Sequence, residues 1–217
     1  MELILVSVNR GIGRPIGRRD GDPVISAIAK SGIAEPIVFV GGKGIAGDVQ
    51  ADRSVHGGID KAVHAYSADH WPWWQAEKDF VCSAGCFGEN LTVAGADEGD
   101  VSIGDRFRWG DVILEVAQPR GPCATVDIHN SRSDVAHAMT LSERCGWYLR
   151  VTQEGWAPTH HAACVRISAS GGPNVREAFF ARHDARVPLS TLRRVQDAPA
   201  LAESWRRAMA QLISANK

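Results

Sequence analysis

Cys123 is the cysteine whose neighbours are best suited to chemistry. It ends the segment QPRGPC (118–123), which follows an apolar run over 112–117. Two prolines and a glycine predict a stiff turn, which would hold the thiol at the end of a strand beside Arg120. A cation close to a thiol favours the thiolate, which can act as a nucleophile, accept sulfur or bind a soft metal. A small apolar residue buried after a turn is the alternative, and the residues alone leave both open.

The second candidate is the loop GDVQADRSVHGGIDKAVH (47–64), in which polar side chains surround Gly57 and Gly58. Backbone N–H groups of a glycine-rich loop can come close to an anion. Arg53, His56 and Lys61 would add positive charge. The other interpretation is a tight loop whose Asp and Arg side chains satisfy one another, and the spacing does not decide between them.

The remaining histidines and cysteines carry weaker signals. His56, His64 and His70 are eight and six residues apart, which is not a zinc-ligand spacing. Cys82 and Cys86 form a CxxxC without a second pair, and we interpret them, with Cys145 and Cys164, as structural thiols. An odd total of five cysteines excludes a fully paired disulfide framework and favours a reducing compartment, so we expect a cytoplasmic location.

The elements that must position these residues are mostly strands. Short apolar runs between turn signals predict strands over 3–8, 37–40, 91–93 and 163–167, and a hairpin of 107–109 with 112–116. Their irregular spacing favours a β-barrel or sandwich over a parallel α/β sheet. We expect helices over about 67–78 and 131–142. The Gly- and Arg-rich segment 9–22 is interpreted as a mobile lid, a phosphate clamp or a disordered surface loop.

The character of the chain changes at the breaker-rich joint 168–173. Beyond it the sequence predicts three short helices, over about 175–182, 188–195 and 200–213. We therefore predict two domains, 1–168 and 172–217, in a mainly β fold with helices (α+β). Residues 171–217 hold eight basic and four acidic residues, and a basic stripe with Trp205 there is either an interaction surface or a solvated face.

Composition excludes several classes of function. The net charge is −1, from 24 basic and 25 acidic residues, which argues against wholesale binding to nucleic acid. No apolar run approaches 18 residues, and the first residues lack the basic leader of a signal peptide, so we expect neither a membrane span nor a targeting segment.

Five segments and one tryptophan, in order along the chain, carry a family resemblance. They are SAIAK (26–30), GDVQADRSVHGGIDKAVHAY (47–66) followed by Trp74, FGENL (87–91), VSIGDRFRWG (101–110) and LEVAQPRGPC (114–123). On these residues the sequence resembles the MOSC-domain family, the module shared with molybdenum-cofactor sulfurases, and more closely its stand-alone YiiM-like subgroup. The resemblance implies a MOSC β-barrel core followed by a three-helix module. It also implies a molybdenum cofactor (Mo-molybdopterin), with Cys123 as molybdenum ligand or sulfur-handling residue.

The subgroup is associated with the reduction of N-hydroxylated compounds such as 6-N-hydroxylaminopurine, so the resemblance implies a small-molecule substrate and a separate electron-donating reductase. This chain shows no flavin motif of its own, so we expect it not to draw electrons from NADH unaided. A homodimer is an option. A carrier that delivers molybdenum cofactor or sulfur to another enzyme is the alternative function.

A cofactor with a terminal phosphate needs a positively charged cleft lined with amides. The candidate cofactor contacts are Lys30, Arg53, His56, Gly57, Gly58, Asp60, Lys61, Asn90, Arg120 and Cys123. His56 is also a candidate proton donor, because its ordinary pKa lies near neutrality. Asp60 is expected to orient Lys61 or His56, and Asn90 to hydrogen-bond the pterin edge.

Overall fold

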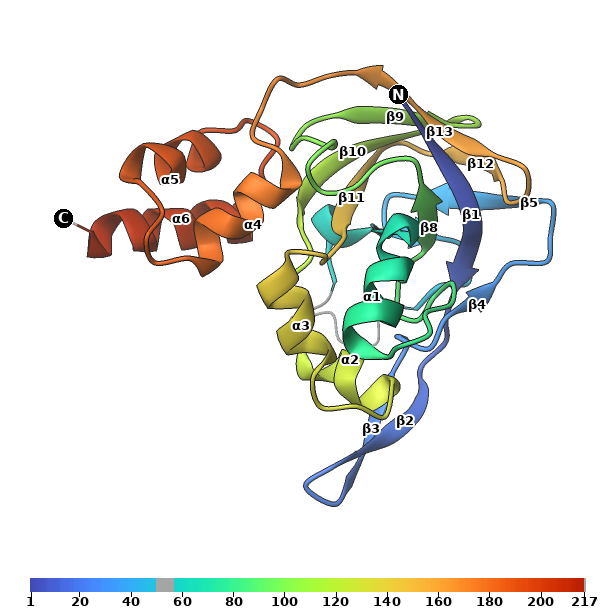
Figure 1. Ribbon diagram of the computed structural model, residues 1–217. Helices are drawn as coiled ribbons and strands as arrows, with labels where there is room; N and C mark the ends of the chain where they lie inside the picture. Colours follow the sequence, from blue (N-terminus) through green and yellow to red (C-terminus); the bar gives the residue numbers. More distant parts are fainter. Residues whose placement is uncertain (50–56, 217) are drawn as a thin grey trace.

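The computed structural model describes residues 1–49 and 57–216, and a closed seven-stranded β-barrel lies at its centre (Figure 1). The strands of the barrel are β1 (Glu2–Arg10), β7 (Val63–Ser67), β8 (Leu91–Ala94), β9 (Arg106–Trp109), β10 (Val112–Pro119), β11 (Trp147–Gln153) and β13 (Ala163–Ser168). They pair in the order β13-β9-β10-β11-β7-β8-β1, and β1 also pairs with β13 to close the ring. All neighbours are antiparallel except β7 and β8. The predicted mainly β fold with helices is confirmed.

Side chains alternate between the inside and the outside of the barrel along each strand, and the inward ones fill it. Along β1, Leu3 and Leu5 are buried, whereas Ile4 and Val6 point outward, as a strand with one buried face requires. The predicted hairpin is present as β9 and β10, with Trp109 opposite Val112 and Gly110 at φ 60° in the turn.

Short strands outside the barrel complete the β-structure. β5 (Ile37–Gly41) pairs with β12 (Gly155–Pro158) and β6 (Gly44–Ile45), and the short β4 (Ser31–Gly32) pairs with the end of β1.

The segment 9–22 corrects a prediction. The loop interpretation is wrong, because this region enters a regular hairpin of β2 (Arg14–Arg19) and β3 (Asp22–Ser26). Asp20 and Gly21 form its two-residue turn with φ of 53° and 92°, the backbone of a type I′ turn. The strands are exposed on most positions, so no period-two apolar pattern announces them.

Three helices cover one end of the barrel: α1 (Trp71–Lys78), α2 (Ala124–His129) and α3 (Val135–Ser142) (Figure 1). The predicted helices over 67–78 and 131–142 are confirmed with later starts, whereas α2 was not predicted. A second apolar cluster lies beneath them, built from Tyr66, Trp74, Phe87, Val126 and Met139 among others.

The C-terminal segment forms the three expected helices: α4 (Val175–His183), α5 (Leu189–Gln196) and α6 (Glu203–Ala215). Phe179, Trp205 and Met209 belong to the same apolar cluster as barrel residues such as Phe107 and Leu114. The core is therefore continuous across the joint, and the division into two domains stays a prediction. None of the helices in the described part of the chain has the length and apolar character that a membrane crossing requires.

Asn174 caps α4 at this joint, and its loss should have a measurable cost. Its side-chain oxygen accepts a hydrogen bond from Glu177 N at 2.7 Å, and its amide donates to Gly99 O at 3.2 Å. We expect Asn174→Ala to lower the free energy of unfolding by about 1 kcal/mol, because the first turn loses its cap. Asn174→Asp keeps the cap acceptor and should lose less. Urea unfolding of the three proteins measures both, and equal losses in the two variants would contradict the capping role.

Candidate functional site

A cavity of about 330 Å³ lies where the β2–β3 hairpin, the loop before β8 and the turn after β10 meet. Its lining includes Arg19, Ile25, Ile28, Lys30, Asp48, Lys61, His64, Phe87, Gly88, Asn90, Arg120, Cys123 and Tyr148. Five of the predicted contacts line it together, namely Lys30, Lys61, Asn90, Arg120 and Cys123. Gly57, Gly58 and Asp60 are not part of the lining, and Arg53 and His56 lie outside the described residues.

The GEN part of FGENL builds one wall of the cavity. Glu89 is fully buried and accepts hydrogen bonds from Gly85 N at 2.6 Å, Phe87 N at 3.1 Å and Thr92 Oγ1 at 2.8 Å. Burial raises the pKa of this carboxyl, and the three donors oppose that shift. Glu89 therefore fixes the loop that presents Phe87 and Gly88 to the cavity.

Asn90 holds three parts of the chain together. Its amide nitrogen donates to Asp48 Oδ2 at 2.9 Å and to Asn9 O at 3.2 Å, and its oxygen accepts from His64 N at 3.1 Å. A hydrogen bond to the pterin edge would compete with these bonds, so the geometry supports a positioning role for Asn90.

Two lysines of the cavity have lowered pKa values, so they lose their positive charge at a lower pH than an ordinary lysine. Lys30 is buried and forms an ion pair with Asp48, which also accepts from Gly11 N at 2.7 Å. Burial lowers the pKa of Lys30 from the ordinary 10.5, and Asp48 opposes the shift. Burial, with the nearby charge of Arg182, also lowers the pKa of Lys61.

Asp60 ties the short 3-10 turn Ile59–Lys61 to the barrel. It forms an ion pair with Arg150 of β11 at 2.8 Å, and Arg150 pairs in turn with Glu115 of β10 at 3.0 Å. The charge of Asp60 raises the pKa of Lys61 against burial. Its predicted role in orienting Lys61 or His56 stays a prediction.

The inner wall of the cavity contains His64 and Tyr148, which sequence reasoning missed. Their rings lie 5.1 Å apart between centroids, on the adjacent strands β7 and β11. Burial, together with the charge of Arg120, holds the pKa of His64 well below its ordinary value, so its imidazole is neutral. His64 Nε2 is buried and has no hydrogen-bond partner within the described part of the protein. Such an orphaned polar atom beside a cavity indicates a place for a ligand.

Cys123 lies at the residue before α2 and is half-buried in the cavity lining. The other thiols differ in their surroundings. Cys145 and Cys164 are fully buried, and burial raises the pKa of both thiols, that of Cys164 to about 12. These two cysteines therefore stay protonated, as their structural interpretation requires. No three His, Cys, Asp or Glu side chains gather as a metal site within residues 1–49 and 57–216.

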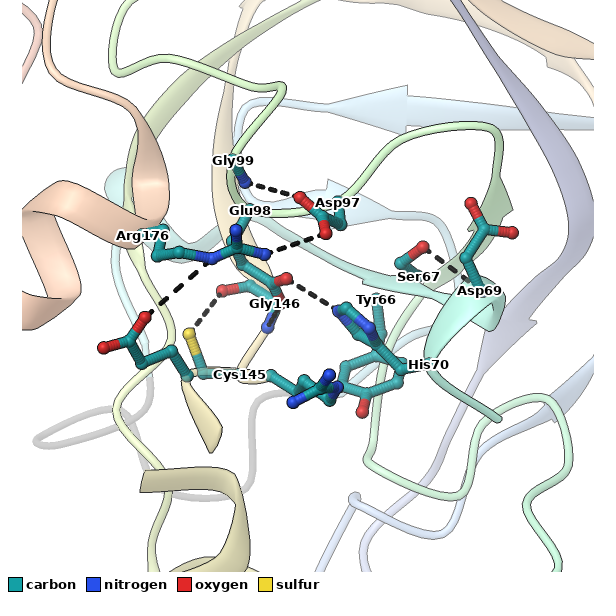
Figure 2. A network of polar contacts seen from close by, with 12 residues as sticks. Tyr66, Ser67, Asp69, His70, Asp97, Glu98, Gly99, Cys145, Gly146 and Arg176 are labelled. Atoms are coloured by element: carbon teal, nitrogen blue, oxygen red, sulfur yellow. Dashed lines mark hydrogen bonds and ion pairs between the residues drawn. The ribbon is translucent and has the colours of Figure 1, made fainter. Parts of the chain in front are cut away.

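Figure 2 shows a buried network around Glu98, and Gly146 connects this network to the backbone of Arg120. Glu98 is fully buried, with Oε2 at 2.7 Å from His70 Nε2, and its Oε1 accepts from Gly146 N at 2.7 Å. The carbonyl of Gly146 then accepts from Arg120 N at 3.1 Å. Gly146 has φ 73°, and a Cβ there would lie 2.4 Å from Ala65 O, so only glycine fits this position.

A family model described as the MOSC domain matches residues 52–168. The protein YiiM of Escherichia coli is 34% identical over 195 residues, which are 88% of this chain and 84% of that protein. A protein of Gibberella moniliformis named "Reductase" is 39% identical over 142 residues, which are 62% of this chain but 24% of that protein.

The comparison with solved structures agrees with these sequence matches. The crystal structure of YiiM from Geobacillus stearothermophilus superposes with a TM-score of 0.81 at 28% identity, covering 97% of this chain and 99% of that one. The matched segment 52–168 includes Lys61, His64, Asn90, Arg120 and Cys123 of the cavity. The chain therefore belongs to the MOSC-domain family and is similar to the YiiM proteins over almost its whole length.

Proposed function

We propose that the chain binds the molybdenum cofactor in this cavity and uses it to reduce N-hydroxylated compounds. The observation that carries the proposal is the position of the Cys123 thiol in a cavity lined by Arg19, Lys30, Lys61 and Arg120. Asp48 is the single carboxylate among the described lining residues, and it is paired with Lys30. The cavity is therefore electropositive around a half-buried sulfur.

This set of residues fits the cofactor. The cationic side chains suit its terminal phosphate, and a thiolate is the kind of soft ligand that molybdenum favours. The orphaned His64 Nε2 offers a hydrogen-bonding position inside the cavity. When bound, the cofactor supplies two-electron redox chemistry, and the protein positions and tunes it.

The reaction would convert an R–NHOH group, two electrons and two protons into R–NH₂ and water. Arg19, Lys30 and Lys61 would hold the phosphate, and Cys123 would ligate the metal. Tyr148 keeps its proton because burial raises the pKa of its phenol, so it could donate a hydrogen bond to the N-hydroxyl oxygen. His56 stays the predicted proton donor.

A separate reductase would deliver the electrons. The relative named "Reductase" matches this chain over only 24% of its own length. The separate electron donor is therefore a proposal that rests on the family resemblance.

The test is to produce the protein in a host that makes the cofactor and to measure molybdenum per chain. Turnover of 6-N-hydroxylaminopurine by the loaded protein is then followed with a chemically reduced dye as electron donor. Bound molybdenum and amine product support the proposal. Loaded protein that shows no turnover, yet passes cofactor or sulfur to an apo-enzyme, would instead establish the carrier. Protein that stays free of molybdenum would refute cofactor binding.

Retention of the cofactor should weaken at alkaline pH. The pKa values of Lys30 and Lys61 lie below the ordinary 10.5 in the folded protein, so their positive charge is lost as pH rises toward that value. A phosphate held by these ammonium groups is released over the same range. Lys61→Arg keeps its charge there and should shift the loss to higher pH. Molybdenum retained after dialysis at stepped pH measures this, and identical curves for the two proteins would rule out the role of Lys61.

A further inference from the structure

We propose that Arg150 is a positioning residue for Lys61, through which the C-terminal helices help to shape the cavity. The importance of Lys61 for the cofactor rests on the proposed function. The contacts of Arg150 are independent of it, so they can be tested on the protein without cofactor.

Arg150 lies on β11, where three segments of the chain meet. Its Nε donates to Asp60 Oδ1 at 2.9 Å, and its Nη2 lies 2.8 Å from the same oxygen. Nη1 donates to Glu115 Oε1 at 3.0 Å, and Nη2 donates to the carbonyl of Ala200 at 2.9 Å. A planar guanidinium has enough N–H donors to bind these three acceptors at once in fixed directions, which a lysine could not do in the same way.

The barrel holds Arg150 from one side. Glu115 lies opposite Arg150 where β10 pairs with β11, and opposite Arg106 where β10 pairs with β9. Glu115 Oε2 accepts from Arg106 Nε at 2.8 Å, so this carboxylate is bound between two arginines. The guanidinium of Arg150 is therefore attached to a row of side chains that crosses three paired strands.

The C-terminal helices hold Arg150 from the other side. Ala200 belongs to the loop between α5 and α6, and Arg206 of α6 binds this loop. The Arg206 guanidinium donates to the carbonyl of Ala198 at 2.9 Å and to those of Pro199 and Leu201 at 3.3 Å each. These carbonyls surround Ala200 in the sequence, so Arg206 helps to fix the acceptor that Arg150 binds.

Asp60 connects Arg150 to the cavity. Asp60 and Lys61 are neighbours in one 3-10 turn, and Lys61 lines the cavity whereas Asp60 does not. Arg150 therefore holds the Asp60 carboxylate at the barrel. Burial and the charge of Arg182 lower the pKa of Lys61, and the charge of Asp60 opposes them. Without Arg150, this carboxylate would be able to turn toward Lys61 and compete for its ammonium group with an anion in the cavity.

The experiment measures the pKa of Lys61 in the full-length protein without cofactor. The chain has five lysines, at positions 30, 43, 61, 78 and 217, so NMR of protein labelled with ¹³C at lysine Cε gives few signals, and Lys61→Arg identifies the one from Lys61. We expect Arg150→Gln to raise the pKa of Lys61, because the charge of Asp60 loses its partner. Arg150→Lys keeps a positive charge beside Asp60 and should lie closer to the wild type.

Two further comparisons test the path of this effect. In the Asp60→Asn protein, Arg150→Gln should leave the pKa of Lys61 unchanged, because the carboxylate through which it acts is gone. Arg206→Gln loosens the loop between α5 and α6 and should raise the pKa by less than Arg150→Gln does. Arg207→Gln is the matched control, since Arg207 is an exposed neighbour of Arg206, and it should have no effect.

The outcomes decide each part of the proposal. An unchanged Lys61 pKa in Arg150→Gln, or a rise that persists in the Asp60→Asn protein, would overturn the positioning role. A rise in Arg150→Gln but none in Arg206→Gln would overturn the part assigned to the C-terminal helices.

The loaded protein gives a second, separate result. Arg150→Gln should retain less molybdenum than the wild type after dialysis at neutral pH, although its Lys61 keeps the proton to a higher pH. Loss of charge on Lys61 could not cause such a decrease, whereas competition by Asp60 would. If the wild-type protein binds no molybdenum, the proposed function fails, and the NMR titration still decides the role of Arg150.

Discussion

Cys123→Ser is expected to lower the molybdenum content and the reduction of N-hydroxylated substrates together. The loss should exceed the roughly 10–100-fold that follows the loss of a residue behind a metal ligand, because here the ligand itself is changed. A serine hydroxyl is harder than a thiolate and keeps its proton at neutral pH, so it is a poor ligand for a metal that prefers sulfur. The substitution nearly conserves volume, and the half-buried position should tolerate it without unfolding. Metal analysis and dye-coupled turnover of the same preparations measure the two losses.

Cys82→Ser is the matched control for this experiment. Cys82 is also half-buried, but it does not line the cavity. It should keep both molybdenum and turnover. If Cys123→Ser retains its full metal content and stays active, the ligand assignment fails, whereas full metal with no turnover would assign the sulfur to the reaction and not to binding.

Glu98→Ala is expected to lower the free energy of unfolding by about 1–3 kcal/mol for each of the two buried groups that lose their hydrogen-bond acceptor. The carboxylate is fully buried between His70 Nε2 and Gly146 N, at 2.7 Å from each (Figure 2). Without it, both groups would remain buried and lose these hydrogen bonds. Because Gly146 O accepts from Arg120 N, we expect the cavity wall to loosen as well. Urea unfolding followed by circular dichroism gives the difference in stability.

Two comparisons make this result specific to the buried network. Glu98→Gln keeps one oxygen as an acceptor and should lose less stability than Glu98→Ala. Glu203→Ala removes an exposed carboxylate that pairs with Arg206 and Arg207, and it should stay within about 0.5 kcal/mol of the wild type. A Glu98→Ala protein as stable as Glu203→Ala would show that the network contributes little.

The parts of the fold that could be predicted are those whose pattern is local. Trp109 and Val112 across Gly110-Asp111 give a hairpin signal within a few residues, and it is confirmed. Every position of β7 is buried, but two of them are the polar residues His64 and Ser67. The segment therefore lacks the continuous apolar run by which a buried strand is recognised in a sequence. The β2–β3 hairpin lies outside the barrel and has no buried face, so its sequence does not alternate between apolar and polar residues. The Asp-Gly turn at 20–21 is the local signal that predicts it.

The residues of the candidate site also fall into those that a local sequence pattern predicts and those that only the fold brings together. Arg120 and Cys123 share a six-residue segment, Lys61 belongs to the glycine-rich loop, and the family resemblance added Lys30 and Asn90 from other segments. His64 and Tyr148 meet because β7 and β11 pair with these two residues opposite each other. No spacing in the sequence encodes that register, which depends on how the whole barrel closes. His64 could still have been singled out, because it lies inside the quoted segment 47–66.

The pairing of β1 with β13 has a consequence for the order of folding. The ring closes only when Leu3 meets Cys164, two residues separated by most of the chain. Contacts between such distant residues must overcome a large loop-closure entropy, so barrels of this kind fold slowly. During synthesis, the edge of β1 that pairs with β13 stays without its partner until β13 has left the ribosome. A nascent chain halted before residue 163 would present that unpaired edge to other chains, which makes this interval the one in which association with them is most hazardous.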